Sequence, residues 1–290
     1  MSSEHAYPKS GLMSQVRAEW IKLRTLRSTW ITVAIVVVAA IGLAVLFSFI
    51  AADQWTHGQL KDRINFDPIR ISQAGSFIAE IAFGVIGALV MTSEYSTGAI
   101  KTTLAGCPRR TPVAMAKALV LGVFVLAISE VLAFASFFVS RSVLLANGGR
   151  EVTGKLNPVA LVAQAHVPVV SLSTPGVPMA LVRTGLFLAL IAVAGLALGM
   201  LLRSTAGAIS LYVALLLVIP IIVSLLPASI SGHINPYLPG SLGNAMETAS
   251  GNTSNYDGVL LTAWTATGYL VAYVVGLLVI GTALFVKRDA

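Results

Sequence analysis

Two glutamates, Glu80 and Glu130, lie inside long apolar stretches of this 290-residue chain. An ionised group near the centre of a bilayer costs at least about 2.5–3.5 kcal/mol, so such residues often mark a pathway for a polar solute. The two stretches are consecutive and antiparallel, and each glutamate lies about eight to ten residues from the end of its stretch on the same side of the membrane. This predicts that they lie at similar depth and share a site. Arg183 is the nearest plausible counter-charge. Three interpretations stay open: a place in a pathway, a structural clasp between helices, or contact of one glutamate with water.

No enzymatic constellation accompanies these acids. The segment Gly149–Leu156 matches the phosphate-binding loop up to its last position, where Leu156 replaces the Ser or Thr that holds magnesium. The four histidines are scattered and form neither a metal set nor a nucleophile–base pair. The sequence therefore predicts no catalytic residue, no metal site and no cofactor, and we expect the chain not to be an enzyme.

The composition is that of an integral membrane protein. Hydrophobic residues make up 56% of the chain and charged residues 11%, and the mean hydropathy is +0.85. The apolar runs are continuous, as in membrane helices, whereas barrel strands alternate apolar and polar residues. We predict an all-α fold, a single transmembrane domain over 1–290, with six spans at 30–52, 72–93, 112–140, 178–202, 206–226 and 258–286.

Lys and Arg residues are more frequent on the side of the membrane that holds the two termini and the loop after the second span. Because such residues are retained in the cytoplasm, we predict that both termini are cytoplasmic. The net charge of +7 then follows from topology and contact with anionic lipid, and we expect no nucleic-acid partner. The first apolar run is too long for the core of a cleaved signal peptide.

Residues 10–28 predict an amphipathic helix before the first span. Its apolar residues share one helical face: Met13, Val16, Trp20 and Leu23. Glu19 and Lys22 are spaced to pair on the helix surface, and Trp20 suits the headgroup boundary. The helix serves either as a topology anchor or as an element on the inner leaflet beside a cytoplasmic partner.

The stretch from Glu94 to Arg110 is polar and basic, although it lies between two apolar runs. Glu94 suits a helix N-terminus, and Arg109 and Arg110 provide two long donors at the far end for an acidic groove on another protein. The stretch keeps helix-forming residues. We therefore expect a cytoplasmic helix that a partner protein grips.

Three further features concern helix packing and irregular structure. Gly195 and Gly199 form a GxxxG pattern that allows another helix to approach closely. Pro220 is expected to kink or break the fifth span. The stretch Pro227–Asp257 mixes Gly, Pro and Asn with a short helical candidate at Ser241–Ala249, which fits a broken or re-entrant helix or, equally, an ordinary surface loop.

In this order of elements, the sequence resembles the permease subunits of ABC-2 type transporters over nearly the whole chain. Two stretches carry the resemblance. Before the first span they are Glu19, Trp20, Lys22 and Arg24. After the second span they are Glu94, Tyr95, Gly98, Lys101, Leu104, Pro108, Arg109, Arg110 and Lys117. The loop between the third and fourth spans is longer than the resemblance leads us to expect.

The resemblance implies an elbow helix at 10–28, a cytoplasmic coupling helix in the loop between spans two and three, and a re-entrant outer element between spans five and six. It also implies two copies of a separate ATP-binding subunit, a second permease copy in a homodimer, and export of a hydrophobic or amphipathic compound across the cytoplasmic membrane. Two alternatives remain: an ion-coupled secondary transporter with Glu80 and Glu130 as proton relay, or a membrane anchor or sensor without transport.

Overall fold

Six helices that are long and apolar enough to cross a membrane dominate the computed structural model, which describes residues 11–58, 63, 66–106, 110–152, 164–248, 254–256 and 259–287. In these ranges the spanning helices are α2 (Arg27–His57), α5 (Ser76–Ser96), α7 (Arg110–Ala146), α9 (Val177–Leu202), an interrupted helix over Thr205–Ser224, and α14 (Ala263–Lys287). The predicted all-α membrane architecture is confirmed.

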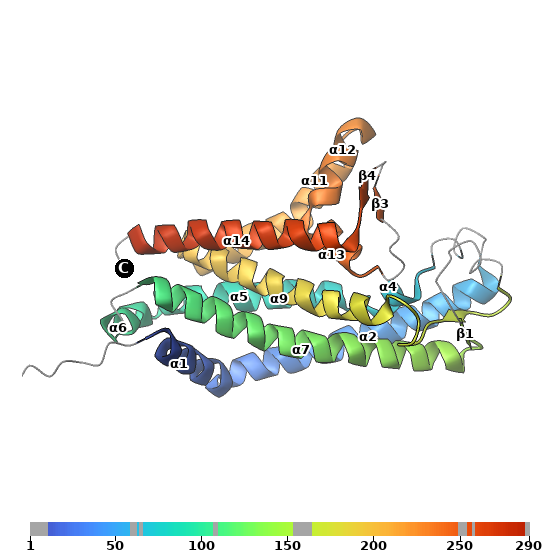
Figure 1. Cartoon of the computed structure of the whole chain (residues 1–290), viewed down its shortest axis with the longest axis horizontal. Helices are drawn as coiled ribbons and strands as arrows, with labels where there is room; N and C mark the ends of the chain where they lie inside the picture. The colour runs from blue at the N-terminus through green and yellow to red at the C-terminus, as the bar shows by residue number, and fades with distance from the viewer. Residues whose placement is uncertain are drawn as a thin grey trace, which may run out of the picture.

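The centre of the bundle is α9, the most buried of the six helices. It packs against α5, α7 and α14, while α2 lies along α7 and α5 (Figure 1). Its side chains Leu188, Ala192 and Leu196 belong to the main apolar core. The outer helices expose large apolar residues such as Val38 and Val279, as expected of a surface that faces hydrocarbon.

Helices α5 and α9 touch backbone to backbone. A Cβ atom added at Gly195 would lie 2.1 Å from the carbonyl oxygen of Gly84, and one added at Gly87 would lie 1.9 Å from that of Ala192. Side chains larger than hydrogen therefore do not fit at these crossings. The close approach predicted from Gly195 and Gly199 is confirmed, and the neighbouring helix is α5.

The fifth spanning helix is interrupted, as Pro220 predicted. It consists of α10 (Thr205–Val213), a π-helical turn η1 (Ala214–Val218) and α11 (Ile219–Ser224). Pro220 has no N–H to donate and its ring crowds the preceding turn, so a regular α-helix cannot run through this point. In Figure 1, α11 leaves the bundle at an angle.

Short helices follow this break. They are α12 (Ala228–Ile234), the 3-10 turn η2 (Asn235–Tyr237) and α13 (Pro239–Met246). α13 packs against α9 and α14 and buries Leu242, Ala245 and Met246 in the main core. The predicted helical candidate was Ser241–Ala249, so the helix both begins and ends a few residues earlier than predicted.

The remaining elements divide between the two ends of the bundle (Figure 1). At one end, here called the α6 end, lie α1 (Leu12–Thr25), α6 (Ala99–Gly106) and the C-terminal end of α14. Toward the other, here called the α4 end, lie α4 (Pro68–Ser72) and the short strands. β1 (Arg150–Glu151) pairs in parallel with β2 (Pro168–Val169), and β3 (Ser254–Tyr256) pairs antiparallel with β4 (Val259–Leu261).

Two spanning helices begin later than the predicted spans. α5 starts at Ser76 instead of 72, because a turn separates it from α4 and Gly75 lies against α2, where a Cβ would meet the carbonyl oxygen of Ala40 at 2.2 Å. α14 starts at Ala263 instead of 258, because β4 occupies the preceding residues.

Candidate functional site

The chain reverses direction at the α6 end between α5 and α6. Gly98 adopts a left-handed conformation with φ 71°, which a residue with a side chain rarely takes. The backbone N–H of Thr97 and its Oγ1 both donate to the carbonyl of Ser93, at 3.1 and 2.8 Å. These two bonds satisfy a backbone carbonyl in the last turn of α5, and α6 begins directly after Gly98.

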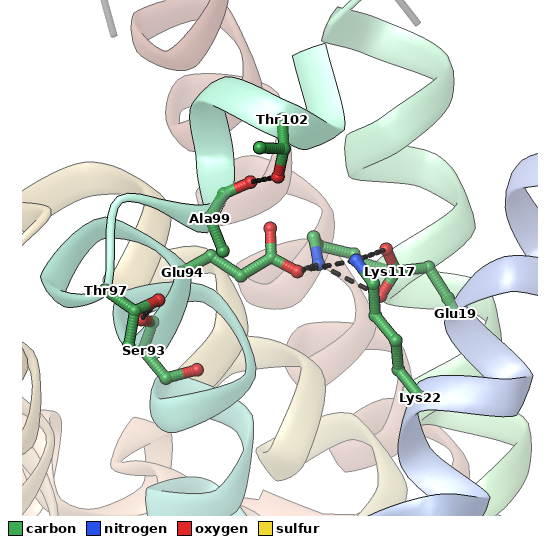
Figure 2. Close-up of polar contacts among 8 residues, drawn as sticks. All are labelled: Glu19, Lys22, Ser93, Glu94, Thr97, Ala99, Thr102 and Lys117. Atoms are coloured by element: carbon green, nitrogen blue, oxygen red, sulfur yellow. Dashed lines mark hydrogen bonds and ion pairs between the residues drawn. The ribbon is translucent and has the colours of Figure 1, made fainter. Parts of the chain in front are cut away.

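α6 is anchored on one side and open on the other. Ile100 is buried in the main core, whereas Lys101, Thr102 and Ala105 are exposed. Thr102 Oγ1 donates to the carbonyl of Ala99 at 2.8 Å (Figure 2). The exposed side is therefore a short polar surface with one cation, held against the bundle through its apolar side.

A cluster of four charged side chains lies beneath this turn, between α1, α5 and α7 (Figure 2). Lys117 Nζ donates to Oε1 of Glu94 at 2.6 Å and to Oε2 of Glu19 at 2.9 Å. Lys22 Nζ donates to the same Glu94 oxygen at 2.9 Å and to Oε1 of Glu19 at 3.0 Å. Two cations and two anions balance, and we call this group the charged cluster.

Most of the charged cluster is excluded from water. The side chains of Lys117, Glu19 and Glu94 are 1%, 5% and 11% exposed, whereas that of Lys22 is 44% exposed. Partial burial lowers the pKa of Lys22, but the hydrogen bonds that it donates to Glu94 and Glu19 raise it above its usual value overall, so Lys22 is a cation at neutral pH. Charges this deeply buried persist only when paired, so the cluster joins the three helices firmly.

Glu94 uses one carboxylate oxygen for both lysines. Its other oxygen is buried, has no hydrogen-bond partner among the described residues, and is turned toward α6 in Figure 2. Glu94 lies one helical turn before Gly98. Its position is therefore inside the bundle at the root of the α6 turn, not on the surface where a direct contact with another protein was expected.

A comparison with protein-family models now places the chain. The model described as ABC-2 family transporter protein matches residues 15–194, which include α6 and the whole charged cluster. The chain belongs to this family. The predicted resemblance is confirmed, and the molecule is a multi-pass membrane permease of a transporter. No curated protein matches the sequence at a significant level.

The other residues predicted for coupling take different positions in this ABC-2 permease. Arg110 Nη1 donates to the carbonyls of Phe285 and Val286, at 3.0 and 3.4 Å, and so binds the C-terminal end of α14. The guanidinium of Arg203 lies 5.3 Å from the ring centre of Tyr95. Lys101 is exposed on α6. Arg109 lies outside the described residues.

In the permease, the face that α1 presents to the bundle overlaps only in part with its predicted apolar face. Glu19 and Leu23 are buried, and Met13 is 80% exposed. The pairing of Glu19 with Lys22 is confirmed, and its extension to Lys117 and Glu94 explains why the charged side of α1 points inward. Of the predicted apolar face, Leu23 and Val16 pack against the main core, and Met13 lies on the outer side.

The aromatic and basic residues of the predicted elbow lie near the start of α2. Trp20 and Trp30 both contact the ring of Phe124 edge-on, at centroid distances of 6.2 and 5.6 Å. The indole N–H of Trp30 donates to the carbonyl of Arg24 at 3.0 Å, and the Arg24 residue is exposed. These contacts fix the bend between α1 and α2.

Glu80 and Glu130 lie on opposite faces of α9. A Cβ at Gly185 would lie 2.4 Å from Oε1 of Glu130, whereas Phe187 lines the same hollow as Glu80. Gly185 and Phe187 are two positions apart in α9, so they point about 200° apart around the helix axis. The glutamates are at a similar level, as predicted, but α9 separates them, so the structure shows no shared site and favours no proton relay between them.

Arg183 is not the counter-charge of either glutamate. Its Nη2 donates to the carbonyl of Thr248 at 2.6 Å, and its guanidinium carbon lies 5.9 Å from the ring centre of Trp264. Arg183 therefore joins α9 to the segment between α13 and α14. The reason is the rotation of α9, which turns Arg183 toward α14.

Two residues of the permease were missed as site residues. Lys117 entered the sequence analysis only with the residues of the family resemblance, although a lone cation between Ala116 and Ala118 is a signal of the same kind as Glu80. Glu247 lies in the stretch Pro227–Asp257, for which the sequence predicted only irregular structure. No local signal marks its burial, because the packing of α13 produces it.

Proposed function

We propose that the chain is the membrane-spanning subunit of an ATP-binding-cassette exporter in the cytoplasmic membrane, with both termini in the cytoplasm. Two identical copies assemble with two copies of a separate ATP-binding subunit and move a hydrophobic or amphipathic compound outward. ATP is hydrolysed in the partner. Nucleotide can change the membrane subunit only through contacts that differ between its two conformations, so the function requires a contact element.

The charged cluster beneath α6 is the observation that carries this proposal. Glu94 lies one helical turn before Gly98, so a movement of α6 is passed directly to it. Glu94 is in turn bonded to Lys117 of α7 and to Lys22 of α1. Because these bonds are buried, they are costly to break. A movement of α6 therefore shifts α5, α7 and α1 together and is not absorbed by rotation of single side chains. α6 is thus the coupling helix and α1 the elbow helix.

The residues divide into contact and positioning roles. Lys101, on the exposed side of α6, contacts an acidic surface of the ATP-binding subunit, and Arg109 adds a second cation. Glu94 and Gly98 set the place and direction of α6, and Arg110 fixes the start of α7 to the end of α14.

At the α4 end, α12 and α13 form the re-entrant outer element of the transporter. The packing of α13 between α9 and α14 supports this role, because irregular backbone at membrane depth is stable only where protein or water surrounds it. The interrupted helix before it supplies the flexible connection.

Reversal of the charge at Lys101 tests the coupling role. We expect Lys101→Glu to weaken binding of the ATP-binding subunit by about tenfold, because a cation facing an acidic surface becomes a repelling anion. The subunit is first identified by co-purification from native membranes, and its affinity is then measured against the permease in lipid nanodiscs.

The matched control is Lys287→Glu, which reverses another exposed lysine at the same end of the bundle. It is expected to leave binding within about twofold of the unaltered protein. If Lys101→Glu binds the subunit as tightly as the unaltered permease and transports as much per ATP, α6 is not the coupling element.

A further inference from the structure

Two adjoining hollows lie near the α4 end of the bundle. The smaller, about 220 Å³, is bounded by α5, α9, the interrupted helix and α13, and the larger, about 410 Å³, extends toward α4 and α2. The two hollows share four lining residues: Ser76, Phe77, Asn244 and Glu247. The two hollows therefore adjoin at these residues, and Glu80 lines the smaller one.

Glu80 supplies an unused acceptor to this space. The residue is 5% exposed and lines the smaller hollow, and its carboxyl oxygen Oε1 is buried without a hydrogen-bond partner among the described residues. The neighbouring hydroxyl of Tyr212 does not serve it, since that hydroxyl donates to the backbone carbonyl of Glu80 at 2.6 Å. A donor on a bound molecule would satisfy this buried acceptor.

Glu247 is the second carboxyl group of the same space. It is 5% exposed, and its Oε1 accepts a hydrogen bond from Ser76 Oγ at 3.0 Å. Burial raises the pKa of Glu247 to about 7, although the hydrogen bond from Ser76 and the charge of Arg70 oppose the rise and Asp67 adds to it. Glu80 and Glu247 also repel each other, so a cation between them removes an unfavourable interaction.

The remaining charged groups around the space are already engaged or lie at its mouth. Asp67 accepts hydrogen bonds from the backbone N–H groups of Ile69 and Arg70 at 2.9 and 3.3 Å, which caps α4. The Arg70 residue is exposed and lines only the larger hollow. Among the described lining residues, the smaller hollow therefore holds two acids and no basic side chain.

The other walls are apolar and aromatic: Phe77, Phe187, Leu216 and Pro220. Aromatic faces attract cations and also accept hydrocarbon, so the walls suit an organic body attached to a positive group. They do not suit a bare metal ion, which requires a shell of oxygen ligands. In the described part of the chain no three His, Cys, Asp or Glu side chains are grouped to hold a metal.

We propose that this hollow binds a protonated amine carried on an apolar body, with the ammonium group between Glu80 and Glu247. An ammonium group has three N–H donors, which match the free oxygen of Glu80, the carboxylate of Glu247 and the side-chain oxygen of Asn244. As the substrate class of the transporter, this assignment rests on the proposed function. Binding itself needs neither the partner nor ATP.

Binding is measured with the full chain in nanodiscs of zwitterionic phosphatidylcholine, without the ATP-binding subunit. The probe is a dansyl group on a hexyl chain that ends in a free amine, and the matched compound has the amine acetylated and is uncharged. We expect the amine to bind at least about tenfold more tightly than the acetylated compound, because only the amine carries the charge.

Variants of the two acids locate the site. Glu80→Gln and Glu247→Gln are each expected to weaken amine binding by about tenfold and to leave binding of the acetylated compound unchanged. Glu130→Gln is the control, because it neutralises a glutamate at a similar level on the opposite face of α9, and we expect it to bind the amine normally.

The pH response has a defined direction. Between about pH 6 and about pH 8 the amine stays protonated while Glu247 loses its proton, so amine binding should strengthen as pH rises and binding of the acetylated compound should not change. The groups that face Glu247 are Glu80, Asp67, Arg70 and Ser76, and no histidine is among the described residues that line either hollow.

Equal binding of the amine and the acetylated compound to the unaltered protein would overturn the assignment, and that comparison does not depend on the folding of any variant. Unchanged amine binding by Glu80→Gln together with Glu247→Gln would overturn it as well. If the amine does not bind but the permease still binds its ATP-binding subunit, the proposed function stands and the amine site fails. If the amine binds and no such subunit associates, the site stands and the proposed function fails.

Discussion

Replacement of Lys117 by methionine is expected to lower the free energy of unfolding by about 3–5 kcal/mol, because removing one partner of a buried ion pair leaves uncompensated charge. Methionine keeps the volume of the aliphatic chain. Among the described residues, Lys22, which is partly exposed, is then the one cation left to pair with the carboxylates of Glu19 and Glu94. Unfolding in detergent micelles, followed by tryptophan fluorescence, measures the loss, since Trp20 and Trp30 lie against Phe124 of the same helix.

Two control variants separate charge from general damage. Lys101→Met removes an exposed lysine and is expected to change stability by less than about 0.5 kcal/mol. A triple variant that combines Lys117→Met with Glu19→Gln and Glu94→Gln removes the stranded charges and should recover most of the loss. If Lys117→Met is as stable as the unaltered chain, the charged cluster does not hold α1, α5 and α7 together.

The second large effect is expected at the crossing of α5 and α9. Gly195→Leu places a side chain where a Cβ alone would lie 2.1 Å from the carbonyl oxygen of Gly84. Backbone atoms on both helices would have to move apart, so we expect a loss of about 3 kcal/mol or more. The same unfolding measurement detects the loss, and cross-linking between cysteines placed on the two helices reports their separation.

The matched control for this substitution is Gly42→Leu in α2. Gly42 is exposed, and a Cβ there meets no atom within 4 Å, so the leucine faces lipid and improves helix propensity. Its stability should equal or exceed that of the unaltered chain. A chain carrying Gly195→Leu with unchanged stability would contradict the backbone contact between α5 and α9.

The compensated triple variant also bears on the proposed function. It is expected to fold, since the one charge left without its partners, Lys22, is 44% exposed and can be solvated, but it lacks the charge-assisted bonds from Lys117 to the root of α6. If those bonds transmit movement of α6 to α7, the triple variant should bind the ATP-binding subunit and transport less per ATP. Full transport per ATP would show that packing alone connects α6 to the bundle.

Features that depend on local chain chemistry were predictable from the sequence. The continuous apolar runs determined six helices, because each run must satisfy its own backbone hydrogen bonds in lipid. The spacing of Glu19 and Lys22 determined their pairing, Pro220 the interruption of the fifth helix, and Gly195 the close approach of a neighbour. Each of these features follows from residues within one or two helical turns.

Only the tertiary structure decided which side chains meet. Three such features depend on which helices are neighbours and how each is rotated about its axis. They are the pairing of Lys117 with Glu94, the position of Glu247 beside Glu80, and the position of α9 between Glu80 and Glu130. In a soluble protein, the apolar stripe of a helix reports that rotation. Here lipid-facing and protein-facing sides are both apolar, so the hydrophobic pattern carries little information about rotation, and packing between the helices sets it.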